Sequence, residues 1–283
     1  MIIVTGASGH LGRLVVESLL KKVPAREVAA VVRDPDKAKD LAARGVEVRR
    51  GDYARPETLG AAVAGADKLL LVSSNEVGQR ATQHAAVVQA AKAAGVKLLA
   101  YTSILHADTS RLALAAEHLA TEVAIRASGL PHVFLRNGWY LENYTESLAP
   151  VLQHGAKVGS AQGGRVAAAA RVDYAEAAAA VLTGKAERAV YELAGDQPFT
   201  MAELAAEVAR QAGKPIAYVD LPPDQYRAVL IGAGLPAAFA DILVDADVQA
   251  AKGDLDDATG DLRRLIGRPT TTLAAAVSAA LGR

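Results

Sequence analysis

Short apolar runs alternate with helical patterns along the first half of the chain. Each run is rich in β-branched residues and nearly free of polar positions, as expected for a strand buried on both faces of a parallel sheet. The predicted strands are Ile2–Thr5, Val28–Val32, Val46–Arg49, Leu69–Val72, Leu98–Tyr101 and His132–Leu135. The predicted helices between them are His10–Lys21, Asp36–Arg44, Pro56–Ala64, Gly78–Ala94 and Leu112–Ser128. This alternation, with short links, predicts an α/β fold with a doubly wound parallel sheet of Rossmann type.

After Arg136 the pattern becomes mainly helical. The expected helices are Tyr140–His154, a segment from the capping box at Thr200 to about Gln211, Asp224–Ile231, Pro236–Ala251 and Thr271–Leu281. We expect the sheet domain to span residues 1–137, with a segment at about 165–193 returning to it. Residues 138–283 are then expected to form mainly a small, mostly helical C-terminal lobe.

A glycine-rich turn follows the first predicted strand and opens the first predicted helix. It reads Gly6-Ala7-Ser8-Gly9-His10-Leu11-Gly12. Glycines at this place allow a tight turn and a close approach of backbone to a pyrophosphate, and the helix N-terminus behind them offers free N–H groups. The spacing Gly-x-x-Gly-x-x-Gly differs from the usual Gly-x-Gly-x-x-Gly, but the position between strand and helix favours a dinucleotide site over a purely steric turn.

Arg33 selects the type of dinucleotide. Sites for NAD place Asp or Glu at the end of the second strand, where a carboxylate binds the ribose hydroxyls. This chain has Arg33 there, and a guanidinium pairs with a 2′-phosphate. Asp34 follows, but Asp34-Pro35 is typical of a helix cap and first helical residue. We therefore predict NADP(H), the alternative being a solvated charge at the strand end.

Polar residues follow the third, fourth and fifth predicted strands. Asp52 is either a contact to the adenine or a loop carboxylate, and Ser73, Ser74 and Asn75 form either cofactor contacts or a helix cap. The carboxyl ends of such strands line the ligand crevice, which favours cofactor contact for the second group. Ser103 stands where short-chain reductases have a catalytic Ser.

The usual partners of that Ser are absent. The helix after it contains no Tyr-x-x-x-Lys, so the sequence does not support a tyrosinate–lysine proton relay. This favours a substrate electrophilic enough to accept hydride without strong acid catalysis. His106, shortly after Ser103, either faces the site or is a loop histidine.

Aromatic residues make up only 4% of the chain, yet the only Trp, Trp139, lies beside Tyr140 and near Asn143 and Tyr144. These residues follow the sixth predicted strand, at the crevice end. Flat aromatic walls there suit a flat quinonoid substrate, although they are also compatible with a plug between the two parts of the chain.

Composition removes several other classes of function. The chain has no Cys, which excludes disulfides, zinc–thiolate sites, iron–sulfur clusters and a Cys nucleophile. The six His show no ligand spacing, so we expect no metal site. The formal net charge is zero, which disfavours nucleic acid as a partner. We find neither a signal peptide pattern nor an apolar run long enough to span a membrane, and expect a cytoplasmic protein.

These motifs resemble the NmrA-like, atypical short-chain dehydrogenase/reductases, and among them the bacterial NADPH-dependent quinone oxidoreductases. Besides the glycine turn, the resemblance is carried by Val31–Pro35, Ser73–Arg80, Tyr101–Ser103, His106–Ser110, Leu135–Tyr140, Tyr191–Asp196 and Leu265–Thr272. It implies a Rossmann domain with a small C-terminal lobe, and a missing Tyr-x-x-x-Lys as a family trait. It implies NADPH held by Gly6 to Leu11, Arg33, Ser73 to Asn75 and the loop from Asn137 and Gly138.

Two classes of function follow. The first is an enzyme that passes hydride from NADPH to a quinone. The candidate substrate wall is Asn75, His106, Trp139, Tyr140 and Asn143. Water, His106 or Tyr140 would supply a proton. A sister group reduces triphenylmethane dyes and is similar at His118–Glu122. The second class is a redox sensor that binds NADP(H) without turnover. The chain is expected to act as a monomer or a homodimer.

Overall fold

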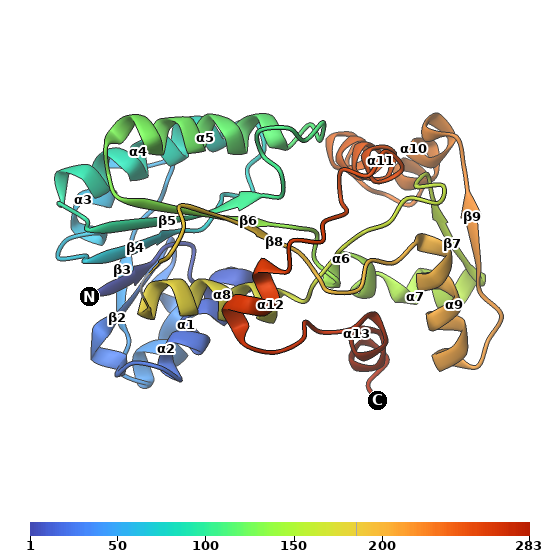
Figure 1. Cartoon of the computed structure of the whole chain (residues 1–283), viewed down its shortest axis with the longest axis horizontal. Coiled ribbons are helices and arrows are strands. Elements are labelled where there is room, and N and C mark those ends of the chain that lie inside the picture. Colours follow the sequence, from blue (N-terminus) through green and yellow to red (C-terminus); the bar gives the residue numbers. More distant parts are fainter. Residues whose placement is uncertain (185) are drawn as a thin grey trace.

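Parallel strands form the central sheet of this computed structural model, which describes residues 1–184 and 186–283 (Figure 1). Their spatial order is β3-β2-β1-β4-β5-β6-β8. The strands are β1 (Ile2–Val4), β2 (Val28–Val32), β3 (Glu47–Arg50), β4 (Lys68–Leu71), β5 (Leu98–Ile104), β6 (His132–Asn137) and β8 (Val190–Leu193). The winding direction reverses between β1 and β4, and such a reversal opens a crevice beyond the carboxyl ends of the strands. The predicted doubly wound Rossmann-type sheet is confirmed.

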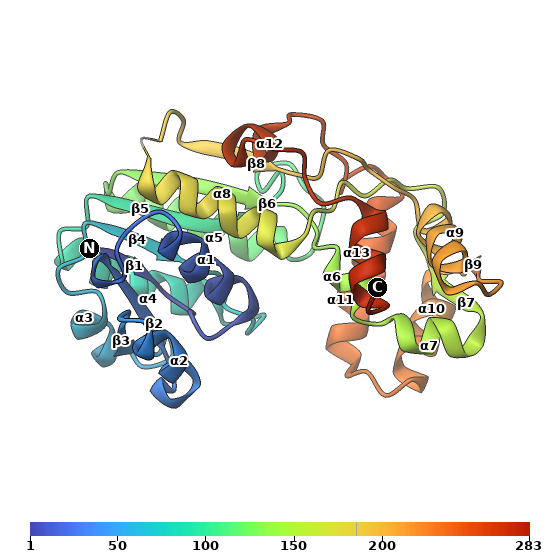
Figure 2. The ribbon, with the colours of Figure 1, turned by 90° about the horizontal axis from the view of Figure 1, so that it is seen from below.

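Successive side chains of the central strands pack against two opposite helix layers. In β1, Val4 belongs to one apolar cluster and Ile3 to the cluster on the other face of the sheet. Both faces are covered, as Figures 1 and 2 show, and this explains the nearly continuous apolar strands. One layer holds α1 (His10–Leu20), α2 (Lys39–Ala43), α8 (Arg171–Thr183) and α12 (Asp261–Ile266). The other holds α3 (Leu59–Ala62), α4 (Arg80–Ala93) and α5 (Ala115–Ser128).

The last strand of the sheet comes from a distant part of the sequence. After β6 the chain leaves the sheet, and it returns through α8, which packs beside α1, and β8, which pairs with β6. Buried alanines on α8, among them Ala175, Ala178 and Ala179, belong to the same apolar cluster as α1. Their small side chains suit close helix packing.

The remaining segments form a lobe beyond the carboxyl ends of β6 and β8, at the right of Figure 1. It contains a parallel strand pair, β7 (Ala156–Gly159) and β9 (Ala217–Asp220). Its helices are α6 (Glu142–Thr145), α7 (Leu148–His154), α9 (Met201–Ala212), α10 (Pro223–Gly232), α11 (Ala237–Ala250) and α13 (Leu273–Ala280). Tyr144 and Phe199 pack edge to face in its core. None of the described helices is long and apolar enough to cross a membrane.

The structure differs from the predicted elements in a few places. The predicted helix Tyr140–His154 is divided into α6 and α7, because Pro150 has no N–H to continue the hydrogen-bond ladder from α6. Two other predicted helices begin as 3₁₀ turns, η2 (Pro35–Ala38) and η3 (Pro56–Thr58). The strand β5 (Leu98–Ile104) is longer than predicted. The prediction ended at Tyr101 because Thr102 and Ser103 are polar, although both are buried within the strand.

Candidate active site

A cleft of about 500 Å³ lies at the carboxyl ends of the strands on both sides of the winding reversal. It is lined by the glycine turn and by loops that follow β2, β3 and β4, and Tyr140 closes one end. The residues predicted from sequence that line it are Gly6, Ser8, Gly9, His10, Leu11, Arg33, Asp52, Ser73, Ser74, Asn75 and Tyr140. The fold thus brings together residues from distant parts of the sequence.

The turn between β1 and α1 depends on its glycines. Gly6 has φ +60°, in the left-handed region that favours glycine, and the Gly9 N–H donates to the Gly6 oxygen over 3.0 Å. A Cβ on Gly12 would lie 2.4 Å from that oxygen, so α1 comes this close to the turn only with glycine. The α1 N-terminus has no side-chain cap and no acidic residue in its first turn. It is therefore a site for an anion.

Two cations lie at the end of the cleft beside β2. Arg33 and Lys37 both line it, and the Arg33 side chain is 64% exposed. The Arg33 Nη1 lies 3.1 Å from Glu76 Oε1, and Glu76 Oε2 accepts a hydrogen bond from Gln83. A phosphate bound here would meet two positive side chains and would compete with Glu76 for the guanidinium.

The floor of the cleft near β3 is fixed by Tyr53. Its hydroxyl donates to the Val72 oxygen over 2.9 Å and is hydrogen-bonded to the Thr5 hydroxyl. Burial raises the pKa of Tyr53 well above its usual value, so the hydroxyl keeps its proton. Asp52 uses its carboxylate to accept from the Ala54 N–H, which closes the turn after β3.

The loop after β4 is held by side chains behind it. The Ser73 N–H donates to Thr102 Oγ1 over 2.8 Å, and the Ser74 N–H donates to His84 Nε2 over 2.9 Å. Burial lowers the pKa of His84 to about 4, so the ring is neutral at pH 7 and Nε2 accepts. Its other nitrogen, Nδ1, then donates to the Thr121 hydroxyl, 2.9 Å away.

Tyr140 forms the opposite end of the cleft together with Arg171. The Arg171 guanidinium lies 5.3 Å from the centre of the Tyr140 ring, and Tyr174 packs edge to face on the same ring at 5.3 Å. Burial raises the pKa of Tyr140, while the Asn137 side chain and the Arg171 charge oppose that rise. The Tyr140 hydroxyl is therefore protonated at neutral pH.

Several predicted site residues lie outside the cleft lining. Ala7 is fully buried, and its N–H donates to the Val31 oxygen over 3.1 Å. Asn137 and Gly138 are buried at the end of β6, and the Gly138 N–H donates to the Leu193 oxygen over 2.7 Å. The Asn137 Oδ1 has no hydrogen-bond partner among the described residues.

Two residues of the candidate substrate wall, Trp139 and Asn143, also lie outside the lining. Trp139 is half-buried against the core of the small lobe, and its carbonyl oxygen accepts from the Tyr174 hydroxyl. Asn143 is exposed on α6. Of the wall residues that follow β6, only Tyr140 lines the cleft, because the chain turns away from the sheet directly after it.

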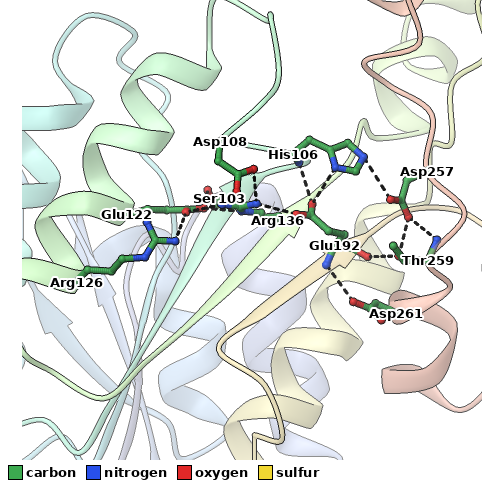
Figure 3. Close-up of polar contacts among 10 residues, drawn as sticks. All are labelled: Ser103, His106, Asp108, Glu122, Arg126, Arg136, Glu192, Asp257, Thr259 and Asp261. Carbon is green, nitrogen blue, oxygen red and sulfur yellow. Dashed lines mark hydrogen bonds and ion pairs between the residues drawn. The ribbon is translucent and has the colours of Figure 1, made fainter.

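Ser103 takes part in a buried charge network, not in the cleft (Figure 3). Its hydroxyl donates to Glu122 Oε1 over 2.7 Å. Arg136 forms a bidentate ion pair with Glu122, with distances of 2.9 and 2.8 Å. It also contacts Asp108 and Glu192, each at 2.8 Å. The network ties α5 to the ends of β5, β6 and β8 and gives Ser103 a structural partner.

His106 lies at the edge of the same network and does not line the cleft (Figure 3). Its backbone N–H donates to Glu192 Oε2 over 2.9 Å, and its ring Nε2 is 3.3 Å from Asp257 Oδ2. The hydrogen bond to Asp257 raises the pKa of His106. It thereby links the loop after β5 to the segment before α12. Among the described residues, no group of His, Asp and Glu is arranged to hold a metal ion.

The cleft also contains residues that sequence reasoning missed. These are Val31, Lys37, Gly51, Val72, Glu76, Arg80, Gln83 and Arg171. Lys37 lies in η2, the 3₁₀ turn directly after Arg33 and Asp34. Arg171 comes from a distant segment, and no local pattern places it near Tyr140.

The donor set fits the cofactor predicted from sequence. An uncapped helix N-terminus suits a pyrophosphate, and Arg33 with Lys37 suits a 2′-phosphate. These two anion sites belong to the same cleft and lie on the β1 and β2 side. The end at Tyr140 is left for the nicotinamide half and a planar partner.

Comparison with known proteins agrees with this geometry. The chain is 53% identical to quinone oxidoreductase 2 of Escherichia coli (strain K12) over 279 residues, 98% of each chain. The crystal structure of an NADPH-dependent quinone oxidoreductase from Escherichia coli, complexed with NADPH, superposes with a TM-score of 0.97. It has 52% identity and covers 99% of this chain and 100% of that one.

A dye-reducing enzyme is also similar. Triphenylmethane reductase of Citrobacter sp., complexed with NADP(H), has a TM-score of 0.95 and 42% identity, covering 99% of this chain and 100% of that one. The NmrA-like family matches residues 1–272. The predicted resemblance is confirmed: the chain belongs to the NmrA-like family.

Proposed function

We propose that this protein is an NADPH-dependent reductase that transfers hydride to quinones. The observation that carries the proposal is the single cleft that joins two anion sites, at α1 and at Arg33, to an aromatic end at Tyr140. The similarity to an NADPH-dependent quinone oxidoreductase, at 52% identity over nearly the whole chain, supports the same reaction.

The role of the protein in this proposal is mainly to bind and orient. When bound, NADPH supplies the hydride. The α1 N-terminus holds the pyrophosphate, Arg33 and Lys37 hold the 2′-phosphate, and the loop Ser73–Asn75 positions the nicotinamide half. Asn75 and Tyr140 contact the quinone from opposite sides of the cleft end. Alignment of two flat rings gives most of the rate enhancement, without a Tyr–Lys relay.

Tyr140 is the better candidate for a proton donor within the protein. It lines the cleft, and burial raises its pKa, so its hydroxyl is protonated at neutral pH. His106 is bound to Glu192 and Asp257 away from the cleft. Because the hydroquinone anion is a stable species that water can protonate, Tyr140→Phe should lower kcat less than tenfold.

The test follows NADPH absorbance with the purified protein and benzoquinone, a naphthoquinone or a triphenylmethane dye. We expect quinone-dependent NADPH oxidation, faster than with the dye. If no acceptor supports turnover and the protein binds NADPH and NADP⁺ with different affinities, the protein is a redox sensor and not an enzyme. Faster turnover with the dye would favour a second candidate function, reduction of triphenylmethane dyes, which the similarity to the Citrobacter sp. reductase supports.

Trp139 is tested separately. The sequence predicts that it forms part of the quinone wall, whereas it is half-buried against the small lobe and does not line the cleft. Trp139→Ala should therefore change the KM for quinone through the position of Tyr140, with the affinity for NADPH unchanged. An unchanged KM would remove only the role of Trp139.

A further inference from the structure

Arg80 is a buried cation that forms no ion pair with a carboxylate among the described residues. It begins α4 and lines the cleft, although only 9% of its surface is exposed. Its Nε donates to the Ser74 oxygen over 2.6 Å, and its Nη1 lies 3.4 Å from His118 Nε2. Within residues 1–184 and 186–283 the guanidinium forms no ion pair with a carboxylate. Burial of an uncompensated charge is strongly unfavourable, which points to a ligand.

The two histidines behind Arg80 are uncharged at neutral pH. Burial, and then the Arg80 charge, lower the pKa of His118 to about 3 and that of His84 to about 4. The Tyr101 hydroxyl is hydrogen-bonded to His118 Nδ1 at 2.8 Å and keeps its proton. Glu117 accepts the N–H groups of Gly78 and Arg80 through Oε1, and its Oε2 has no hydrogen-bond partner among the described residues, so it forms no ion pair with the guanidinium. Arg80 thus adds a cation without a carboxylate partner to the lining of the cleft.

The contacts of Arg80 differ from those of the two proposed phosphate sites. Those sites lie at α1 and beside Arg33, next to β1 and β2. Arg80 is anchored to the loop after β4 and to α5, at the side of the cleft that leads to β5. The sheet order places the loops after β4 and β5 between the two phosphate sites and β6, the strand that leads to Tyr140. In the proposed function the hydride acceptor binds on that side of the cleft, and the Arg80 charge also opposes the rise in the pKa of Tyr140.

We propose that Arg80 donates a hydrogen bond to the carbonyl oxygen of the quinone and stabilises the negative charge that forms there. This inference rests on the proposed function. A hydride from the nicotinamide C–H bond, with its electron pair, forms an O–H bond at one carbonyl oxygen of the quinone, and the displaced electron pair moves through the ring, which becomes aromatic, onto the other carbonyl oxygen. The nicotinamide is oxidised by two electrons, the quinone is reduced by two, and one proton from water completes the hydroquinone. A prepositioned guanidinium acts here like an oxyanion hole.

The test uses a probe that resembles the charged product. Lawsone, a hydroxynaphthoquinone, is an anion at neutral pH, whereas menadione has a methyl group in place of the hydroxyl and is uncharged. Binding of each to the NADP⁺-loaded protein is measured by calorimetry, and no turnover is required. The variants are Arg80→Gln and Arg80→Lys, and the control is Arg26→Gln, an exposed arginine near the opposite end of β2.

We expect Arg80→Gln to bind lawsone about 10- to 100-fold more weakly, as for loss of a hydrogen bond to a charged group, and menadione nearly as the wild type does. Arg80→Lys should lie between the two, and Arg26→Gln should match the wild type. With NADPH and a quinone, the kcat of Arg80→Gln should fall about 100-fold.

Three results would overturn the inference. One is an unchanged ratio of lawsone to menadione affinity in Arg80→Gln. Another is a wild-type protein that does not prefer lawsone. The third is loss of NADP⁺ binding in both Arg80 variants, which would assign the guanidinium to the cofactor. A wild-type protein that binds lawsone through Arg80 but does not reduce quinones would refute the proposed function alone.

Discussion

Arg33 and Glu76 allow a quantitative test of cofactor choice. The structure pairs Arg33 Nη1 with Glu76 Oε1 at 3.1 Å at the proposed 2′-phosphate site. Hydrogen bonds to charged groups contribute about 1.5–3 kcal/mol. Because the Arg33 side chain is 64% exposed, we use the lower part of that range, about 1.5–2 kcal/mol. Arg33→Ala should therefore weaken NADPH binding about 10- to 30-fold.

NADH has no 2′-phosphate, so Arg33→Ala should leave its affinity nearly unchanged. Glu76→Gln should have the opposite effect on NADPH, because the carboxylate competes with the phosphate for Arg33. An exposed pair contributes about 0.2–1 kcal/mol, so NADPH binding should tighten about 1.5- to 5-fold. Calorimetry with both nucleotides measures these changes, with Arg26→Ala as control. Equal losses for NADPH and NADH in Arg33→Ala, or weaker NADPH binding in Glu76→Gln, would refute the reasoning.

Further changes test other parts of the molecule. Gly12→Ala places a Cβ 2.4 Å from a backbone oxygen; urea denaturation should show a loss of about 1–3 kcal/mol in unfolding free energy, with weaker NADPH binding, and native values for both would contradict the close approach. Glu122→Gln removes the charge of the bidentate partner of Arg136, whose side chain is 4% exposed. Since two other carboxylates still contact Arg136, the free energy of unfolding should fall by about 3 kcal/mol, measured by urea denaturation. A fall below about 1 kcal/mol would mean that the network does not stabilise the protein. The hydrogen bond to Asp257 raises the pKa of His106, so its contribution to stability is complete below about pH 6.5 and is lost as pH rises through the higher folded-state pKa. Thermal midpoints measured across this range should fall for the wild type and less steeply for His106→Gln; identical slopes would show that this pair does not contribute.

The sequence was sufficient for the sheet because each central strand is buried on both faces. Such strands appear as continuous apolar runs, and six of the strands of the sheet were predicted within a few residues. The strand β8 of the sheet and the two strands of the small lobe were not predicted. The strand β9 is only four residues long and mostly exposed, so the short apolar run Ile216–Val219 did not indicate a strand buried on both faces. The break between α6 and α7 comes just before Pro150. It was not predicted because Pro150 lies within an apolar pattern that is typical of a continuous helix.

In the candidate site, prediction was most informative where function depends on the backbone. Gly6, Gly9 and Gly12 are required by close approach and a positive φ, and such requirements are visible in sequence. The direction of a side chain at a strand end is not visible. Ser103 points to Glu122 and not into the cleft, because the charge network with Arg136 takes its hydroxyl. That network joins segments that are far apart in the chain.

One measurement tests the central claim most directly. Purified protein is mixed with NADPH and benzoquinone, and the NADPH consumed and the hydroquinone formed are both quantified. Direct hydride transfer predicts one hydroquinone for each NADPH, with a much higher kcat/KM for NADPH than for NADH. NADPH that stays unconsumed in the presence of quinone, or turnover equally efficient with NADH, would contradict the account.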